Sequence, residues 1–593
     1  MASLIPREIL FGNPEREGAS VAPDGRRLAF LAPVDGVLNV WVGSLAGDDA
    51  APVTDDRERG IRFYFWADDG RHLVYLQDRG GDEDWHLHAL EPGAGPARDL
   101  TPFAGVQARV IGRERSRPGE LLVGLNRDDP RLHDAYLLRL ADGELRKLAA
   151  NPGLEPWLVD ADLQPRGGMR WLDDGSAEIV VGDAGDPAAR TLVRLPAEDA
   201  LGSSLVGLDR DGRALYLISS LEAETARLLR VELADGSRRV LAEDARYDVA
   251  DVVVHPHEKR VQIATIQRER RDQLVLDEAL ADDVRRMAEL GRGDLFFHGR
   301  DHADRVWIVS LRADDAPAAY HAYDRVARGA RELFSSRPRL AGYELARVEP
   351  FSLEARDGLR LHGYATFPPD RGRERLPTVL RVHGGPWGRD VWGFTPERQW
   401  LANRGYLCLE VNFRGSTGYG KRHLNAGDRE WGQRMHDDLI DTVHWAAERG
   451  YAALVGATFT PDVFRCAVDV VGPSNLGTLL RSVPSYWAPL MAQFYRRIGH
   501  PERDADLLWQ RSPLSRVDQI RIPLLIAQGA NDPRVKQAES EQIVAALRER
   551  GINHEYLLFE DEGHGFVRPD NRLRFYAAAE RFLARHLGGR AED

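Results

Sequence analysis

The chain has 593 residues, of which 43% are hydrophobic and 29% charged, with a formal net charge of −13. This length is several times that of one ordinary domain, so we expect at least two domains with full-sized cores. The charge is spread along the chain and forms no basic block, which argues against nucleic acid and against an anionic membrane surface as partners.

The N-terminus lacks the basic and apolar segments of a signal peptide, and no apolar run is long enough to span a bilayer. The cytoplasm is therefore the expected location. The two cysteines, Cys408 and Cys466, lie in apolar runs that are typical of strands. We expect buried free thiols rather than a disulfide, a metal site or a nucleophile.

The first half of the chain repeats one pattern, an Asp-Gly turn followed by two short strands. Copies begin near Ala22, Trp66, Leu125 and Leu208. Units of about 40–50 residues are typical of β-propeller blades, and about seven would fit before Leu340. A pair of β-sandwiches is the alternative, although the repeats continue for longer than one sandwich needs. The pattern predicts a closed ring of four-stranded blades, with no helix longer than an isolated turn.

Beyond residue 340, apolar strands alternate with helical segments. Near-continuous apolar strands of this kind favour a parallel sheet that is covered by helices on both faces. The sequence therefore predicts a β-propeller over residues 1–340, including a short N-terminal arm, and an α/β-hydrolase domain over residues 341–593.

Three loops of the second half follow predicted strands and carry residues suited to catalysis. The glycines of "HGGPWG" (383–388) leave backbone N–H groups free to form an oxyanion hole. Asp532 in "GANDPRV" and His564 in "DEGHGF" follow later strands. Each loop alone could be an ordinary turn, but their order matches the Asp and His of an α/β-hydrolase triad.

With these loops, and with "NFRGSTGYG" (412–420), the chain resembles the prolyl oligopeptidase family of serine peptidases, within it the acylaminoacyl-peptidase-like branch. The resemblance is closest from Phe351 to Arg590 and implies a propeller that caps the hydrolase domain, with short peptides as substrates in the cavity between them. It also implies that Asp532 orients His564, that His564 is the general base and then the general acid, and that Gly385 gives one oxyanion N–H.

No cofactor is expected, because no His/Cys cluster has metal-ligand spacing and no Gly-rich loop has a phosphate-binding pattern. A homo-oligomer is left open, as are endo-, amino- and acylaminoacyl-peptidase specificities. Leu476 and Trp487 follow a strand at the face of the site and are candidates for an apolar substrate pocket. Ordinary helix core is the alternative for both.

The chain departs from the family at one place. Family members carry a strand and a G-x-S-x-G-G motif between the helix and the segment that here meet at Gly450 and Tyr451. G-x-S-x-G does not occur in this sequence, and Ser416 lacks the upstream glycine of a nucleophile turn, so we interpret it as structural. About 15–20 residues are missing, including the serine and the second oxyanion N–H.

Two hypotheses follow from this gap. In the first, the working protein is a serine peptidase and this sequence lacks a piece of it. Gly450 and Tyr451 would then be far apart, with a gap in the sheet beside the strand at Val468. In the second, the deletion is real and the protein is a non-catalytic relative that at most binds peptides. The helix starting near His436 would then continue through Gly450, as one long helix or as a pair bent there.

Overall fold

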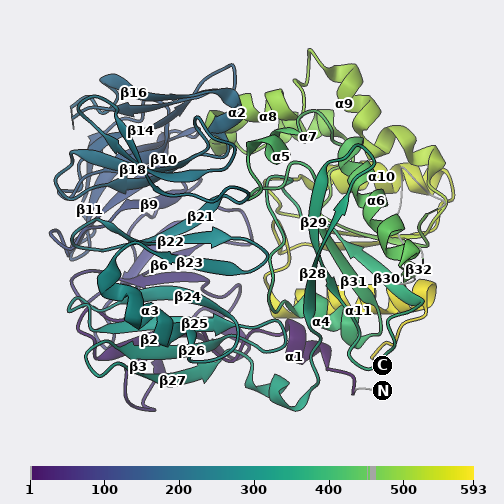
Figure 1. Cartoon of the computed structure of the whole chain (residues 1–593), viewed down its shortest axis with the longest axis horizontal. Coiled ribbons are helices and arrows are strands. Elements are labelled where there is room, and N and C mark those ends of the chain that lie inside the picture. Colours follow the sequence, from purple (N-terminus) through teal and green to yellow (C-terminus); the bar gives the residue numbers. More distant parts are fainter. Residues whose placement is uncertain (1–2, 184, 450–451, 454–462, 593) are drawn as a thin grey trace.

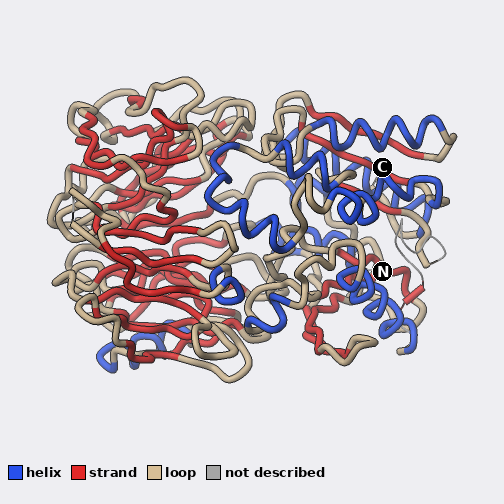
Figure 2. Tube along the Cα trace, turned by 90° about the horizontal axis from the view of Figure 1, so that it is seen from above, coloured by secondary structure: helices blue, strands red, loops and turns tan. Residues whose placement is uncertain are grey.

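The computed structural model describes residues 3–183, 185–449, 452–453 and 463–592. Figure 1 shows two parts side by side, one built almost entirely of strands and one of strands with helices. In the view of Figure 2, most helices lie in the second part. The expected boundary at residues 340/341 falls between the last strand of the first part, which ends at Ser335, and the next strand, which begins at Val348.

Within the described residues, the first part contains seven antiparallel sheets. The first three have four strands each: β1 (Glu17–Val21), β2 (Arg27–Val34), β3 (Val37–Ser44), β4 (Ala51–Pro52); β5 (Phe63–Trp66), β6 (Leu73–Gln77), β7 (His86–Leu90), β8 (Arg98–Asp99); β9 (Ala108–Gly112), β10 (Glu120–Asp129), β11 (Leu132–Arg139), β12 (Leu145–Ala149). These sheets are consecutive in the sequence, as the blades of a propeller are.

The other four sheets continue the same order. They are β13 (Leu154–Val159), β14 (Pro165–Trp171), β15 (Ala177–Val181), β16 (Arg190–Leu195); β17 (Ser204–Leu208), β18 (Ala214–Ser219), β19 (Arg227–Glu232), β20 (Arg238–Ala242); β21 (Val249–Val254), β22 (Val261–Gln267), β23 (Arg271–Val275); β24 (Asp294–Arg300), β25 (Val306–Arg312), β26 (Ala319–Asp324), β27 (Gly329–Ser335). A short helix, α2 (Ala197–Ala200), follows β16.

Apolar clusters between adjacent blades close the ring. Phe30 and Leu28 of the first blade pack with Ile308 and Phe334 of the seventh, and similar clusters join each other pair of neighbouring blades. A blade buries both faces only when its neighbours stack on it. The predicted β-propeller is therefore confirmed, with seven blades.

The predicted Asp-Gly turns are also present. Gly25, Gly70 and Gly212 each follow an aspartate between the first two strands of a blade, with φ of 71°, 65° and 64°. Gly175, with φ of 82°, follows an aspartate between the second and third strands of the fourth blade. This left-handed backbone region is readily reached only by glycine. The Asp-Gly pairs thus set the turn in these blades.

The expectation of four strands in every blade is wrong for the sixth. After β23 the chain forms η1 (Glu278–Leu280) and the helix α3 (Ala281–Ala288), which is longer than an isolated turn. Val284 and Met287 of α3 pack against Trp307 and Leu311 of the seventh blade. The helix therefore buries the apolar side chains at this position, where a fourth strand was expected.

The N-terminal arm, which we grouped with the propeller, packs instead on the second part of the chain. The short helix α1 (Arg7–Phe11) lies against α11 (Pro569–Leu587) and α4 (Pro396–Asn403), and Ile5 and Phe11 are in the core they share. Arg7 N–H donates to Glu592 at 2.8 Å. The two ends of the described chain therefore lie together, as Figure 1 shows.

In the described residues of the second part, the strands form two sheets. A five-stranded sheet has the order β28-β29-β31-β30-β32, and a parallel three-stranded sheet has the order β33-β34-β35. Their strands are β28 (Val348–Glu354), β29 (Arg360–Thr366), β30 (Leu376–Arg381), β31 (Leu407–Asn412), β32 (Ala452–Ala453), β33 (Ala467–Val470), β34 (Leu524–Gly529) and β35 (His554–Phe559).

Helices cover both faces of these sheets, as an α/β-hydrolase domain requires. Cys408 and Leu525 face α11, whereas the adjacent Leu409 and Ile526 belong to clusters on the opposite face. The remaining helices are η2 (Pro338–Gly342), α5 (Lys421–Asn425), α6 (Arg434–Glu448), α7 (Leu476–Ser482), η3 (Ser485–Leu490), α8 (Met491–Arg497), α9 (Ala505–Arg511), η4 (Pro513–Gln519) and α10 (Gln537–Glu549). The predicted α/β fold is confirmed. Cys408 and Cys466 are both buried free thiols, as expected.

The strands on either side of the expected gap are less buried than their neighbours β31 and β34. Every residue of β31 and β34 is buried, whereas most of β30 and β33 is only half-buried and Val470 is exposed. Strands in the middle of a parallel sheet are normally buried on both faces. Among the described residues no ladder joins β30 to β33.

The junction of Gly450 and Tyr451 lies outside the described residues, so the expected separation of these two residues is not tested. On its near side α6 ends at Glu448, and on its far side β32 pairs with β30 in parallel. Continuation of the helix beyond Gly450, expected for an intact junction, is therefore not found in residues 452–453.

Candidate active site

Asp532 and His564 form the hydrogen bond that the sequence predicts. Nδ1 of His564 lies 2.8 Å from Oδ2 of Asp532. Asp532 follows β34 and His564 follows β35, so two neighbouring parallel strands bring both side chains to the same edge of the sheet. The Asp532 side chain is fully buried, whereas that of His564 is 31% exposed. The imidazole is therefore accessible while its carboxylate partner is not.

The backbone fixes the orientation of the Asp532 carboxylate. Its Oδ1 accepts hydrogen bonds from the N–H groups of Arg534 (2.8 Å) and Val535 (2.9 Å). Oδ2 is thereby directed at the imidazole, whose Nδ1–H is the donor. In the neutral ring the other nitrogen, Nε2, is then an acceptor. The Asp532–His564 pair, hereafter the dyad, can thus remove a proton from a hydroxyl group.

The "HGGPWG" loop is held at both ends. Arg381, at the end of β30, donates to Asp390 at 3.0 Å, and burial raises the pKa of the Asp390 carboxyl. Arg389 donates to the carbonyl groups of Gln267 (3.1 Å) and Arg268 (3.2 Å) in the propeller. Gly385 has a φ of 125°, a conformation that side chains rarely allow. The oxyanion role of Gly385 stays a prediction.

The two candidate pocket residues differ in their surroundings. Leu476 is buried among Leu479, Ile498 and other core residues, which favours the alternative of helix core. Trp487 is half-buried in η3, and its ring centroid lies 5.2 Å from that of Phe494. Phe494 in turn lies 5.0 Å from Trp387 of the "HGGPWG" loop. Trp387, Phe494 and Trp487 therefore form a row of aromatic rings. Their positions in the sequence did not indicate this row.

Two serines that match part of a nucleophile pattern, Ser416 and Ser474, are unsuited to that role. Ser416 is fully buried, and its Oγ lies 3.0 Å from Nε2 of His383. Ser474 is also buried and hydrogen-bonds to Gln542 at 2.8 Å and to Glu539. Neither hydroxyl is accessible, in line with the interpretation of Ser416 as structural.

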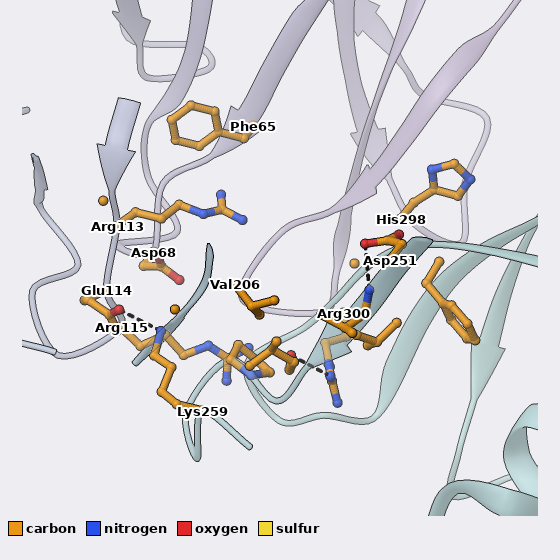
Figure 3. A pocket seen from close by; sticks show the side chains of 18 of the residues that line it. Phe65, Asp68, Arg113, Glu114, Arg115, Val206, Asp251, Lys259, His298 and Arg300 are labelled. Carbon is orange, nitrogen blue, oxygen red and sulfur yellow. Dashed lines mark hydrogen bonds and ion pairs between the residues drawn. The ribbon is translucent and has the colours of Figure 1, made fainter. Parts of the chain in front are cut away.

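A cavity of about 800 Å³ runs along the axis of the propeller and is lined by the first strand of each blade. Contacts between charged side chains cross the cavity at the loops that join the first and second strands of the blades (Figure 3). This end lies away from the hydrolase domain, which is contacted by the loop of Gln267 and Arg268 between a second and a third strand. Glu114 of the third blade pairs with Lys259 of the sixth at 2.7 Å. Arg115 donates to the carbonyl of His302 at 3.2 Å, and the His302 ring lies 3.1 Å from Asp68. These contacts narrow the far end of the cavity.

Two further properties concern the described residues only. They contain no group of three or more His, Cys, Asp or Glu side chains placed to hold a metal ion. None of their helices is both long enough and apolar enough to cross a membrane.

A seven-bladed propeller, an α/β sheet and an Asp–His dyad after adjacent strands define the class of propeller-capped α/β hydrolases. The sequence profile of the prolyl oligopeptidase family matches residues 392–454 and 450–590. Dipeptidyl aminopeptidase BIII of Pseudoxanthomonas mexicana is 45% identical over 616 aligned positions, covering 99% of this chain and 89% of that protein. Dipeptidyl peptidase family member 6 of Caenorhabditis elegans is 31% identical, covering 99% and 87%.

A solved structure supports the same fold. The puromycin-hydrolyzing peptidase of Mycobacterium tuberculosis matches with a TM-score of 0.79 at 20% identity, covering 100% of this chain and 97% of that one. This chain therefore belongs to the prolyl oligopeptidase family of serine peptidases, as the resemblance of its motifs predicted.

Proposed function

We propose that the working protein is a serine peptidase that hydrolyses short peptides between the propeller and the hydrolase domain, and that this sequence lacks the segment carrying its nucleophile. Asp532 orients His564, which takes the proton of the serine hydroxyl and then gives it to the leaving amine. Gly385 supplies one oxyanion N–H. The single observation that carries the proposal is the 2.8 Å contact between His564 and the backbone-anchored Asp532.

Three observations support the absence of a segment at Gly450. The family profile matches in two pieces, and these meet at residues 450–454. The alignment with the aminopeptidase of P. mexicana spans 616 positions, more than the 593 residues of this chain. Strands β30 and β33, between which the nucleophile strand would lie, are only half-buried. Burial of a central strand contributes on the order of 10 kcal/mol to the free energy of unfolding, which is comparable to the stability of a whole domain. A working hydrolase domain is therefore expected to contain this strand.

For the substrate, we favour the release of dipeptides from the N-terminus of peptides. Two relatives that align over nearly the whole chain are both named for dipeptidyl activity. Acylaminoacyl-peptidase action, expected from the branch that the motifs resemble, is the other specificity to test. The half-buried Trp387 and Trp487 are the side chains we assign to an apolar substrate pocket, since both contact Phe494.

The alternative is a non-catalytic relative that only binds peptides. The absence of G-x-S-x-G from this sequence favours it, because His564 without a hydroxyl to activate has little catalytic effect. The peptidase and the non-catalytic relative have the same fold. They differ in whether the protein that the gene encodes contains the segment with the nucleophile.

Intact mass and labelling by a fluorophosphonate distinguish the two functions. A peptidase is expected to be heavier than 66.4 kDa by the mass of about 15–20 residues, the length of a strand and a nucleophile turn. It should also be labelled once. An unlabelled protein of 66.4 kDa would establish the non-catalytic relative. Fluorogenic dipeptidyl, acetyl-aminoacyl and internally quenched peptides then identify the specificity.

We also propose that the chain divides at residues 340/341 into a propeller domain (1–340) and a hydrolase domain (341–593), except that the N-terminal arm belongs to the hydrolase domain. A cytoplasmic location is proposed as well, and cell fractionation tests it. Substrates are proposed to enter between the domains, because Glu114 and Lys259 pair across the far end of the axial cavity.

A further inference from the structure

One loop of the propeller contacts both loops that carry the dyad. It joins β6 to β7 in the second blade and comprises residues 78–85, hereafter the blade-two loop. The carbonyl of Gly80 accepts a hydrogen bond from Nδ2 of Asn531 at 2.8 Å. Asn531 immediately precedes Asp532, and its N–H donates to the carbonyl of Glu562 at 2.9 Å. The propeller is thus one residue away from the dyad carboxylate.

The same loop lies directly on the loop of His564. A Cβ atom placed on Gly81 would be 2.3 Å from the nitrogen of Gly563, and one placed on Gly563 would be 2.3 Å from the carbonyl oxygen of Gly81. Contacts this short would force the two backbones apart. Both glycines are therefore needed for the loops to meet, and Gly563 is adjacent to His564.

A buried ion pair joins the domains beside this contact. Nη1 of Arg59 lies 3.0 Å from Oε2 of Glu562, and Nε of Arg59 lies 3.2 Å from Asp78 of the blade-two loop. The Arg59 and Glu562 side chains are 6% and 0% exposed. Oε1 of Glu562 accepts from the N–H of Arg568 at 2.8 Å. Removing one partner of such a pair leaves a buried charge uncompensated, which is strongly destabilising locally.

A fourth contact reaches the other side of the dyad. Glu83 of the blade-two loop pairs with Arg534 at 2.8 Å. The N–H of Arg534 is one of the two donors that hold Oδ1 of Asp532. Glu83 also accepts a hydrogen bond from Tyr486. The propeller therefore touches the chain immediately before and two residues after Asp532, and immediately before His564.

We propose that the blade-two loop and Arg59 position the dyad, so that the Asp532–His564 hydrogen bond depends on contact between the two domains. Arg59 is then a positioning residue, since it acts on His564 through Glu562 and Gly563. The inference rests on the proposed function and adds that the propeller must contact the hydrolase domain for the dyad to be in place. The Asp532–His564 hydrogen bond can also be measured in a protein that has no serine nucleophile.

The first test compares Arg59→Met with Arg57→Met. Arg57 lies in the same segment and pairs with Asp35 and Asp55 at the propeller surface, with 52% of its side chain exposed. The readout is the downfield proton resonance of the His564 Nδ1–H, assigned by its loss in His564→Ala. We expect Arg59→Met to remove the resonance, Arg59→Lys to retain it in part, and Arg57→Met to leave it unchanged. An unaltered resonance in Arg59→Met overturns the proposal.

A second pair of variants does not rely on the buried charge. Gly81→Ala is compared with Gly93→Ala, because Gly93 has a similar φ, 85° against 91°, but nothing within 4 Å of its Cβ position. Both substitutions carry the same backbone strain, and only the first separates the domains. Amide hydrogen exchange in residues 560–566 should rise by about tenfold or more in Gly81→Ala alone. Equal exchange in the two variants contradicts the proposal, even if Arg59→Met fails to fold.

If the isolated protein is labelled by fluorophosphonate, a kinetic readout is added. Misplacement of a catalytic group by about 1 Å can cost about 10²-fold in rate, so we expect kcat to fall about 10²-fold in Gly81→Ala with KM changed less than about twofold. A larger KM with unchanged kcat would indicate a binding role and overturn the positioning role. A wild-type protein without activity refutes the proposed function, whereas the resonance and exchange tests still decide the positioning of the dyad.

Discussion

The ring of Phe11 in the N-terminal arm stacks on that of Tyr576 in α11, with centroids 3.4 Å apart and planes 6° from parallel. The edge of the Trp400 ring completes the contact, at 5.7 Å from Phe11. Residues 565 positions apart in the sequence thus form one aromatic core. The arm is therefore a part of the hydrolase fold, although the whole propeller separates it from that domain along the chain.

Replacing Phe11 with Ala should destabilise the hydrolase domain by about 3–5 kcal/mol, the usual cost of truncating a buried phenylalanine. Urea denaturation followed by tryptophan fluorescence measures the loss. Phe63→Ala is the control, since the Phe63 side chain lies in the propeller and is 60% exposed; it should change stability by less than about 0.5 kcal/mol. Equal losses of unfolding free energy in the two variants would show that the arm does not contribute to the hydrophobic core of the hydrolase domain.

In a protein that fluorophosphonate labels, Asp532→Asn should lower kcat by about 10³–10⁴-fold with little change in KM. The Asn amide cannot accept the Nδ1–H of His564 in the way the carboxylate does, and the comparable change in the chymotrypsin triad costs about 10⁴-fold. Steady-state hydrolysis of a dipeptidyl substrate gives both constants. Asp570→Asn, at an exposed position in the first turn of α11, should retain wild-type activity.

A protein of 66.4 kDa that truly lacks the segment should unfold in two calorimetric transitions. The hydrolase domain is expected to unfold first, because β30 and β33 are half-buried, whereas apolar clusters join all neighbouring blades. Phe11→Ala should then lower only the first transition, and Leu217→Ala, in a fully buried position of the propeller, only the second. A single transition shifted by both substitutions would contradict this.

Acid should destabilise the protein partly through His423. Burial lowers the pKa of His423 to about 4, and its Nε2 lies 3.1 Å from the carbonyl of Phe413. Between that value and the ordinary pKa of about 6.5, the unfolded chain binds more protons here than the folded one. Stability from this residue is therefore complete above about pH 6.5 and is lost as the pH falls toward 4.

His423→Gln keeps a donor for the Phe413 carbonyl but cannot titrate. Going from pH 7.5 to pH 5, the wild type should lose about 2 kcal/mol more unfolding free energy than the variant, as 1.36 kcal/mol per pKa unit implies. Urea denaturation of both proteins at the two pH values measures this difference. Parallel losses would exclude His423 as a source of the acid sensitivity.

Local patterns explain which parts of the fold could be predicted from the sequence. Asp-Gly turns and alternating strands act over a few residues, so the blades were found. Asp532 and His564 each follow an apolar strand, and parallel strands bring such positions together. The helix α3 was not expected, because Val284 and Met287 become a core only when the seventh blade packs against them.

Contacts between distant segments could not be read in the same way. Arg59 lies 503 positions from Glu562, and no periodicity relates the two. The only local feature in the sequence was the pair of glycines in "DRGGDEDW" (78–85). Leu476 and Trp487 lie close together in the sequence, yet Leu476 packs in the core while Trp487 meets Phe494. Spacing alone did not separate these two environments.

The first and seventh blades share no strand, since β1 to β4 and β24 to β27 form separate sheets. The ring is joined there by side chains alone, around Phe30 and Phe334. Both chain segments that leave the ring at this junction run into the hydrolase domain, and they touch where the N–H of Glu15 donates to the carbonyl of Ser336 at 3.1 Å. The hydrolase domain therefore tethers the two ends of the ring to each other, so that the first and seventh blades cannot move far apart while that domain is folded, even if the cluster around Phe30 and Phe334 is weakened.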